Sequence, residues 1–73
     1  MIVIASPLKR DFMIDLVDGY KIDDFEFKYV KSEGMNLYFE CTNPDIEKAI
    51  RHVKDRVKGS ELGRTLYFTV TQK

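Results

Sequence analysis

Two segments near the middle of the chain carry an aromatic or apolar side chain at every second position. Aromatic residues occupy every second position of residues 25–30 (FEFKYV), and apolar residues do the same in residues 35–41 (MNLYFEC). A period of two is typical of strands that turn one face to a core. The intervening KSEG ends at Gly34, and glycine adopts a positive φ without steric cost. The pattern predicts a β-hairpin with Met35, Leu37, Phe39 and Cys41 facing inward and Asn36, Tyr38 and Glu40 facing outward.

Two other segments have the period of an amphipathic helix and begin in the same way. Residues 7–18 follow Ser6, residues 44–58 follow Asn43, and each segment starts with proline. Serine and asparagine are good N-caps, and proline suits the first helical position because its missing N–H would have no partner there. A glycine follows each segment, as is common after a helix. The core-facing stripes are expected to be Leu8, Phe12 and Leu16, and Ile46, Ile50, Val53 and Val57.

The first of these segments also has a second interpretation. Asp18-Gly19, flanked by apolar residues, is a strong signal for a hairpin turn. Such a turn would place Leu16 opposite Lys21 and mix apolar and charged side chains on one face, which strand register disfavours. We therefore favour a helix, and an extended segment over residues 7–18 is the alternative.

The two ends of the chain supply the remaining strands. Residues 1–5 (MIVIA) form a short apolar run rich in β-branched residues, and residues 65–71 (TLYFTVT) alternate. The order is then strand, helix, strand, strand, helix, strand, with each helix making a right-handed crossover. This predicts an α+β fold: a ferredoxin-like βαββαβ sandwich, with an antiparallel sheet of order 4-1-3-2 and two helices on one face. We expect a single domain over residues 1–73.

Composition narrows the functions that such a domain can have. The chain has 73 residues, of which 44% are hydrophobic and 33% charged, with one histidine and one cysteine. Domains of this size often need a disulfide, a metal or a partner subunit. With so few ligands we expect no metal and no cofactor, and instead a homo-oligomer or a small protein partner. A lone cysteine suits a reducing compartment, so we expect a cytoplasmic protein.

Charge and hydropathy argue against two classes of partner. Twelve basic residues balance twelve acidic ones, and no apolar run approaches the roughly 18 residues of a membrane helix. We therefore expect no membrane association. Nucleic-acid binding is the runner-up function, because central tyrosines of such a sheet can stack on bases. Residues 33–40 (EGMNLYFE), however, match the RNP1 pattern of RNA-binding sheets only at Gly34.

The expected fold leaves one face of the sheet without a helix. Tyr67, Val3 and Tyr38 would form a row across its centre, near Lys28. Tyrosine is common at interfaces, although cross-strand tyrosine and threonine pairs also stabilise open sheets. We take Val3, Lys28, Tyr38 and Tyr67 as a candidate interface. The expected function is a small non-catalytic interaction or ligand-sensing module, of unknown ligand, that self-associates through this face.

One group of residues suggests a catalytic alternative. Lys9 and Arg10 fall in the expected first turn of the first helix, where free N–H groups attract anions, and Asn36 lies near the start of a strand. These three residues are a speculative anion site, and a small anion- or phosphate-binding hydrolase is the least favoured function. Because they do not make up a complete catalytic arrangement, we expect that the protein is not an enzyme.

Overall fold

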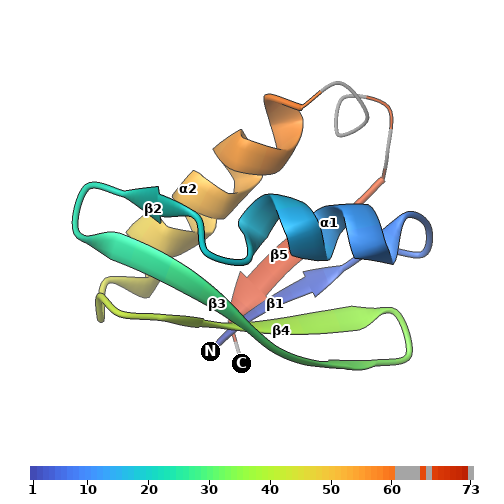
Figure 1. Cartoon of the computed structure of the whole chain (residues 1–73), viewed down its shortest axis with the longest axis horizontal. Coiled ribbons are helices and arrows are strands. Elements are labelled where there is room, and N and C mark those ends of the chain that lie inside the picture. The colour runs from blue at the N-terminus through green and yellow to red at the C-terminus, as the bar shows by residue number, and fades with distance from the viewer. Residues whose placement is uncertain (61–64, 66, 73) are drawn as a thin grey trace.

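The predicted hairpin is confirmed. In the computed structural model, which describes residues 1–60, 65 and 67–72, β3 (Phe25–Glu33) pairs antiparallel with β4 (Asn36–Cys41) (Figure 1). Gly34 turns the chain with a φ of 59°, as expected. Met35 was expected in the core but is 48% exposed. Because Glu33 pairs with Asn36, Met35 belongs to the turn and not to the strand.

The other strands extend this hairpin on both sides. β1 (Ile2–Ala5) lies between β4 and β5 (Thr69–Gln72) and is antiparallel to both. On the far side of β3 lies β2 (Lys21–Ile22). The described residues thus form a five-stranded antiparallel sheet of order β2-β3-β4-β1-β5, which curls into a half-barrel.

The predicted ferredoxin-like sandwich with a sheet of order 4-1-3-2 is therefore wrong. The sheet has an additional strand, β2, at one edge and is rolled into a half-barrel. β2 joins β3 through a tight turn at Asp23-Asp24, and Asp23 takes a φ of 52°. Aspartate tolerates this conformation, but without glycine the turn has little sequence signal. A bulge between Tyr29 and Lys31 adds further bend to β3.

The segment after β1 is helical, as favoured, but the helix begins later than expected. α1 spans Arg10–Val17, and its N-cap is Lys9, in a left-handed conformation with φ 56° and ψ 42°. Ser6 is fully buried and does not cap the helix. Its N–H donates to the Met35 carbonyl over 3.0 Å, and its hydroxyl donates to the Leu8 carbonyl over 2.7 Å. The serine thus ties the β1–α1 loop to the β3–β4 turn.

The second helix also begins later than predicted. α2 spans Ile46–Lys58, and its N-cap is Asp45, whose carboxylate accepts from the Lys48 N–H over 3.2 Å. Asn43 forms the turn before the cap, since its side-chain oxygen accepts from the Asp45 N–H over 2.9 Å. The predicted end of this helix at Gly59 is confirmed, because Gly59 is the C-cap. The two prolines therefore precede the helices and do not open them.

Both helices pack on the same face of the curved sheet (Figure 1). The core between them contains residues from β1, β3, β4, β5 and both helices, among them Ile2, Phe27, Phe39, Met13 and Val53. Arg56 of α2 links the helices from outside this core: its Nε donates to the Leu16 carbonyl over 3.0 Å, and its guanidinium lies 4.5 Å from the Tyr20 ring centroid. The result is a small compact α+β domain. Within the described ranges, no helix has the length and apolar character needed to cross a bilayer.

The last strand is shorter than the predicted one over residues 65–71. β5 begins only at Thr69, so Tyr67 and Phe68 precede it. Val70 is 6% exposed and belongs to the core, as the alternation predicts. Leu66, which the same alternation places in the core, lies outside the described residues.

Candidate interaction surface

The open face is the side of the sheet opposite the helices, and strand register fixes its central row. Val3 on β1 pairs with Tyr38 on β4 and with Thr71 on β5. The expected row of Tyr67, Val3 and Tyr38 is therefore wrong, because Thr71 occupies the place assigned to Tyr67. Tyr67 precedes β5 and is 76% exposed. The structure thus puts two of the candidate interface residues side by side and leaves Tyr67 at the margin.

The centre of the open face is less exposed than the sequence suggested. Val3 is 9% exposed and Tyr38 only 5%, although neither of the two described helices lies on this side of the sheet. Lys31 contributes to this burial, since its ammonium lies 5.3 Å from the centroid of the Tyr38 ring. Lysine can bury its aliphatic stem on such a surface while its charge stays in water. The apolar centre is therefore partly covered by the protein's own side chains.

The bulge in β3 is what brings Lys31 to this face. Tyr29 points to the core side, where its ring meets Phe39 edge-on at 5.7 Å. Strict alternation would send Lys31 to the same side. The register instead shifts between the two residues, so that Lys31 pairs with Tyr38, and Val30 is left 41% exposed. One unpaired residue thus re-aims a cation onto the open face.

Charged side chains on the open face come in opposite pairs. Lys28 on β3 lies directly opposite Glu40 on β4. Farther along, the Lys31 ammonium is 2.6 Å from the Glu33 carboxylate. The hydrogen bond that the Lys31 ammonium donates to the Glu33 carboxylate, helped by the charge of that carboxylate, raises the pKa of Lys31 above its ordinary value of 10.5. The face therefore carries paired charges of both signs at neutral pH.

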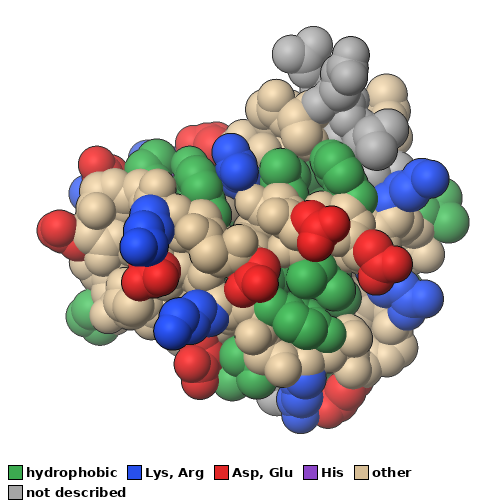
Figure 2. All heavy atoms as spheres, viewed as in Figure 1, with side chains coloured by type: hydrophobic (Ala, Val, Ile, Leu, Met, Phe, Trp, Pro, Cys, Tyr) green, Lys and Arg blue, Asp and Glu red, His purple; other side chains and the backbone are tan. Residues whose placement is uncertain are grey.

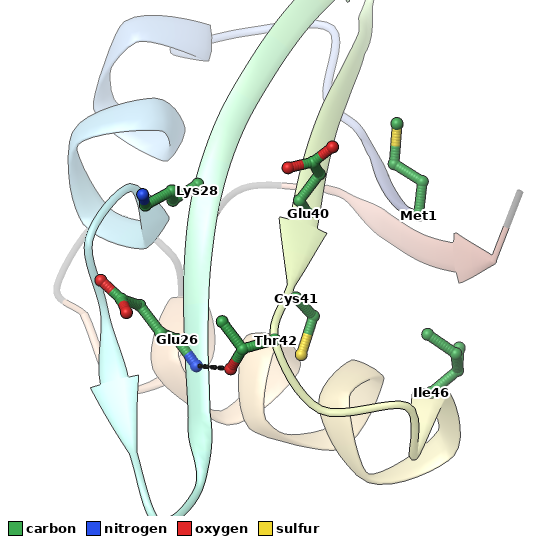
Figure 3. Close-up of a pocket in the computed structure, with 7 residues that line it drawn as sticks. All are labelled: Met1, Glu26, Lys28, Glu40, Cys41, Thr42 and Ile46. Carbon is green, nitrogen blue, oxygen red and sulfur yellow. Dashed lines mark hydrogen bonds between the residues drawn. The ribbon is translucent and has the colours of Figure 1, made fainter.

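A surface hollow of about 450 Å³ opens beside the Lys28–Glu40 pair (Figure 3). Its wall is held together by Thr42, whose hydroxyl accepts from the Glu26 N–H over 3.1 Å and donates to the Asp24 carbonyl over 3.3 Å. In Figure 3 the Cys41 sulfur lies between the side chains of Thr42 and Ile46. Cys41 was expected in the core and is half-buried. The sequence gives no sign of the hollow, because it depends on how the β4–α2 loop meets β3.

The three residues of the speculative anion site lie at one end of the molecule. Arg10 begins α1, and its guanidinium donates to the Gly34 carbonyl in the turn before Asn36. Asn36 pairs with Ala5 across the sheet. Lys9 is exposed and adopts the left-handed N-cap conformation described above. Arg10 therefore already has a backbone acceptor, which leaves fewer donors for an anion.

His52, the one histidine of the sequence, belongs to α2 and faces the β2–β3 turn. Its ring meets Phe25 edge-on at 4.9 Å, and its Nε2 lies 3.7 Å from a carboxylate oxygen of Asp23. This nitrogen is buried and has no hydrogen-bond partner among the residues that the structure describes. Among the described residues, no three histidine, cysteine, aspartate or glutamate side chains come together in a way that could hold a metal ion.

Comparison with protein-family models, curated proteins and solved structures found no match to this chain.

The surface of the protein carries charges of both signs together with hydrophobic side chains. On the side seen in Figure 2, acidic and basic side chains are interspersed with hydrophobic ones, in keeping with the equal numbers of both charges in the sequence. The fold and surface thus define a small α+β half-barrel with one open sheet face.

Proposed function

We propose that this protein is a small, non-catalytic interaction module of the cytoplasm, and that it self-associates through the open face of its sheet. The observation that supports this most is the placement of both helices on one side of the sheet, which leaves the other side without a covering helix or strand among the described residues. Lys28 is exposed on that side, and Tyr67 is exposed at its margin.

The chemistry of the open face suits contact with an identical face. Lys28 and Glu40 stand side by side, so a two-fold arrangement can place each lysine near a glutamate of the second copy. Val30 and Met1, each 41% exposed, add apolar area. A formal net charge of zero removes long-range repulsion between copies. A domain this small also gains more than a large one from extra burial.

Sedimentation velocity over a wide concentration range tests this proposal. The wild type is expected to shift from monomer to dimer as its concentration rises. Lys28→Glu places two acidic groups opposite each other, and Tyr67→Glu removes exposed aromatic area, so both should favour the monomer. Tyr67→Phe, which keeps the ring, is the matched control and should leave association nearly unchanged.

Circular dichroism should show the same fold in all these variants, because Lys28 and Tyr67 are exposed. Tyr38→Glu is a poor probe of the interface, since Tyr38 is buried and a charge there would disturb the fold. A wild type that sediments as a monomer at the highest concentration would contradict the proposed function.

A further inference from the structure

The two edges of the sheet are protected very differently. At one edge, β2 has only two residues, includes Lys21, and runs into Asp23-Asp24. Short length and charge are the usual means by which proteins prevent an edge strand from pairing with another chain. At the other edge, β5 has four residues with the sequence TVTQ. It contains neither charge nor proline, and threonine and valine favour strands.

β5 is also held in an extended conformation by the rest of the fold. It pairs along its length with β1, and Val70 anchors it in the core. Thr69, Thr71 and Gln72 are exposed. Within the described ranges, no strand pairs with the outer side of β5. Every second residue of an edge strand directs its N–H and C=O away from its neighbour, so β5 presents a preformed row of backbone donors and acceptors.

We propose that β5 pairs antiparallel with β5 of a second copy, so that the two sheets join across a two-fold axis. This inference rests on the proposal that the chain self-associates, and it places the contact along the β5 edge instead of across the open face. Thr69 and Thr71 make the edge chemically similar in both directions, and the absence of charge on β5 removes repulsion between the two strands. The identical strand is therefore a fitting occupant of this edge.

Symmetry limits the register to arrangements in which one residue lies opposite its own copy, and two of these pair three of the four residues of β5. A two-fold axis perpendicular to the joined sheet keeps each residue on its own face, and residues directly opposite in an antiparallel pair share a face. Val70 can therefore face the partner's Val70, which puts Thr69 opposite the partner's Thr71. Alternatively, Thr71 faces the partner's Thr71. Both registers put threonine opposite threonine, a pair that stabilises sheets.

The pairing has a consequence for the open face. The helices of both copies would lie on the same side of the joined sheet, and the two open faces would become continuous. Tyr67 shares the alternation of Thr69 and Thr71 and lies just before β5. It would extend past the strand toward the open face of the second copy. Tyr67 is highly exposed in the single chain, and in the edge-paired dimer the second copy would cover part of that exposed surface.

Amide hydrogen exchange of the wild type, measured by NMR at low and high concentration, tests the pairing directly. When about nine-tenths of the chains are paired, the outward amides of β5 should exchange about tenfold more slowly than in the monomer. The amides of β2 provide the internal control and should not change. Face-to-face contact would leave the outward β5 amides unprotected.

Cysteine cross-linking provides a second measurement. Directly opposite Cβ atoms lie about 4.5–5.5 Å apart, close to the span of a disulfide. In a Cys41→Ser background, Thr71→Cys alone, or an equal mixture of Thr69→Cys and Thr71→Cys chains, should form covalent dimers on mild oxidation. Lys28→Cys, at the open face and far from the edge in strand order, is the matched control and should not cross-link.

The outcomes separate this inference from the proposed function. A dimer that Lys28→Glu converts to the monomer and that leaves the β5 amides unprotected would overturn edge pairing and keep self-association through the open face. A protein that stays monomeric would overturn both. Protection of β5 together with cross-linking at Thr69 or Thr71 supports the edge-paired dimer.

Discussion

The left-handed conformation of Lys9 gives a prediction whose size can be worked out from the structure. Lys9 is the N-cap of α1, with φ 56° and ψ 42°. In this region the Cβ of an L-residue crowds the following carbonyl, which costs about 1–2 kcal/mol. Glycine has no Cβ and avoids that cost, but it loses more backbone entropy on folding, about 0.5–1 kcal/mol. Lys9→Gly should therefore stabilise the protein by about 0.5–1 kcal/mol relative to Lys9→Ala.

Alanine is the right reference for this substitution. Both variants remove the same lysine charge from the positive end of the helix, which contributes a few tenths of a kcal/mol at most. Both keep the Lys9 carbonyl, which accepts from the Met13 N–H over 3.1 Å. Only the Cβ differs between them, so their difference isolates backbone strain. Lys9→Ala itself should lie close to the wild type.

Urea denaturation followed by circular dichroism measures the effect. With a denaturant dependence of about 1 kcal/mol per molar for so small a domain, the midpoint of Lys9→Gly should rise by about 0.5–1 M over that of Lys9→Ala. The melting temperature should rise by about 2–8 °C. A glycine variant no more stable than the alanine variant would refute the reasoning, because position 9 would then not be left-handed in solution.

Three further substitutions test other contacts. Arg56→Lys should lower the free energy of unfolding by about 1 kcal/mol, measured in urea, because lysine cannot both stack on Tyr20 and keep the hydrogen bond that the guanidinium makes. Ser6→Ala should cost about 1–2 kcal/mol in the same assay, since the hydroxyl donates a hydrogen bond from a fully buried residue. Because the pKa of Lys31 is raised in the folded state, the stability that the Lys31–Glu33 contact contributes is complete below pH 10.5 and is lost as the pH rises through the folded-state pKa. In Glu33→Gln, an NMR titration should show the pKa of Lys31 lowered toward its ordinary value. An unchanged Lys31 titration in that variant would show that Glu33 is not the cause.

The elements that the sequence predicted correctly depend on local chemistry. Gly34 has the positive φ that its place between two alternating segments implies, and Gly19 has one just after α1. Val70 faces the core, as the alternation of its strand requires. In each case the deciding interaction lies within a few residues along the chain, so a single sequence carries enough information to place it.

The features that the sequence could not predict depend on distant partners. Ser6 resembles an N-cap, but it is drawn into the loop by the carbonyl of Met35, a contact between different parts of the chain. Asp23 takes a positive φ, which a glycine at that position would have suggested from the sequence, so β2, the additional strand of the sheet, was not predicted. The sequence around Tyr29 alternates without interruption, so it gives no signal for the bulge that follows Tyr29. Because the bulge bends β3, the curvature of the sheet could not be predicted either.

These differences move the candidate interface away from the centre of the sheet. The curled sheet and the re-aimed Lys31 cover Val3 and Tyr38, so truncating either should damage the fold more than any contact with another molecule. Exposed apolar area instead lies at the margin, where Tyr67 precedes β5, whose outer side has no pairing strand within the described ranges. A contact built there uses backbone groups and one aromatic side chain together. Open-face association and edge pairing therefore differ in whether they require Lys28 or the β5 backbone, and the variants at Lys28 and Thr71 separate the two.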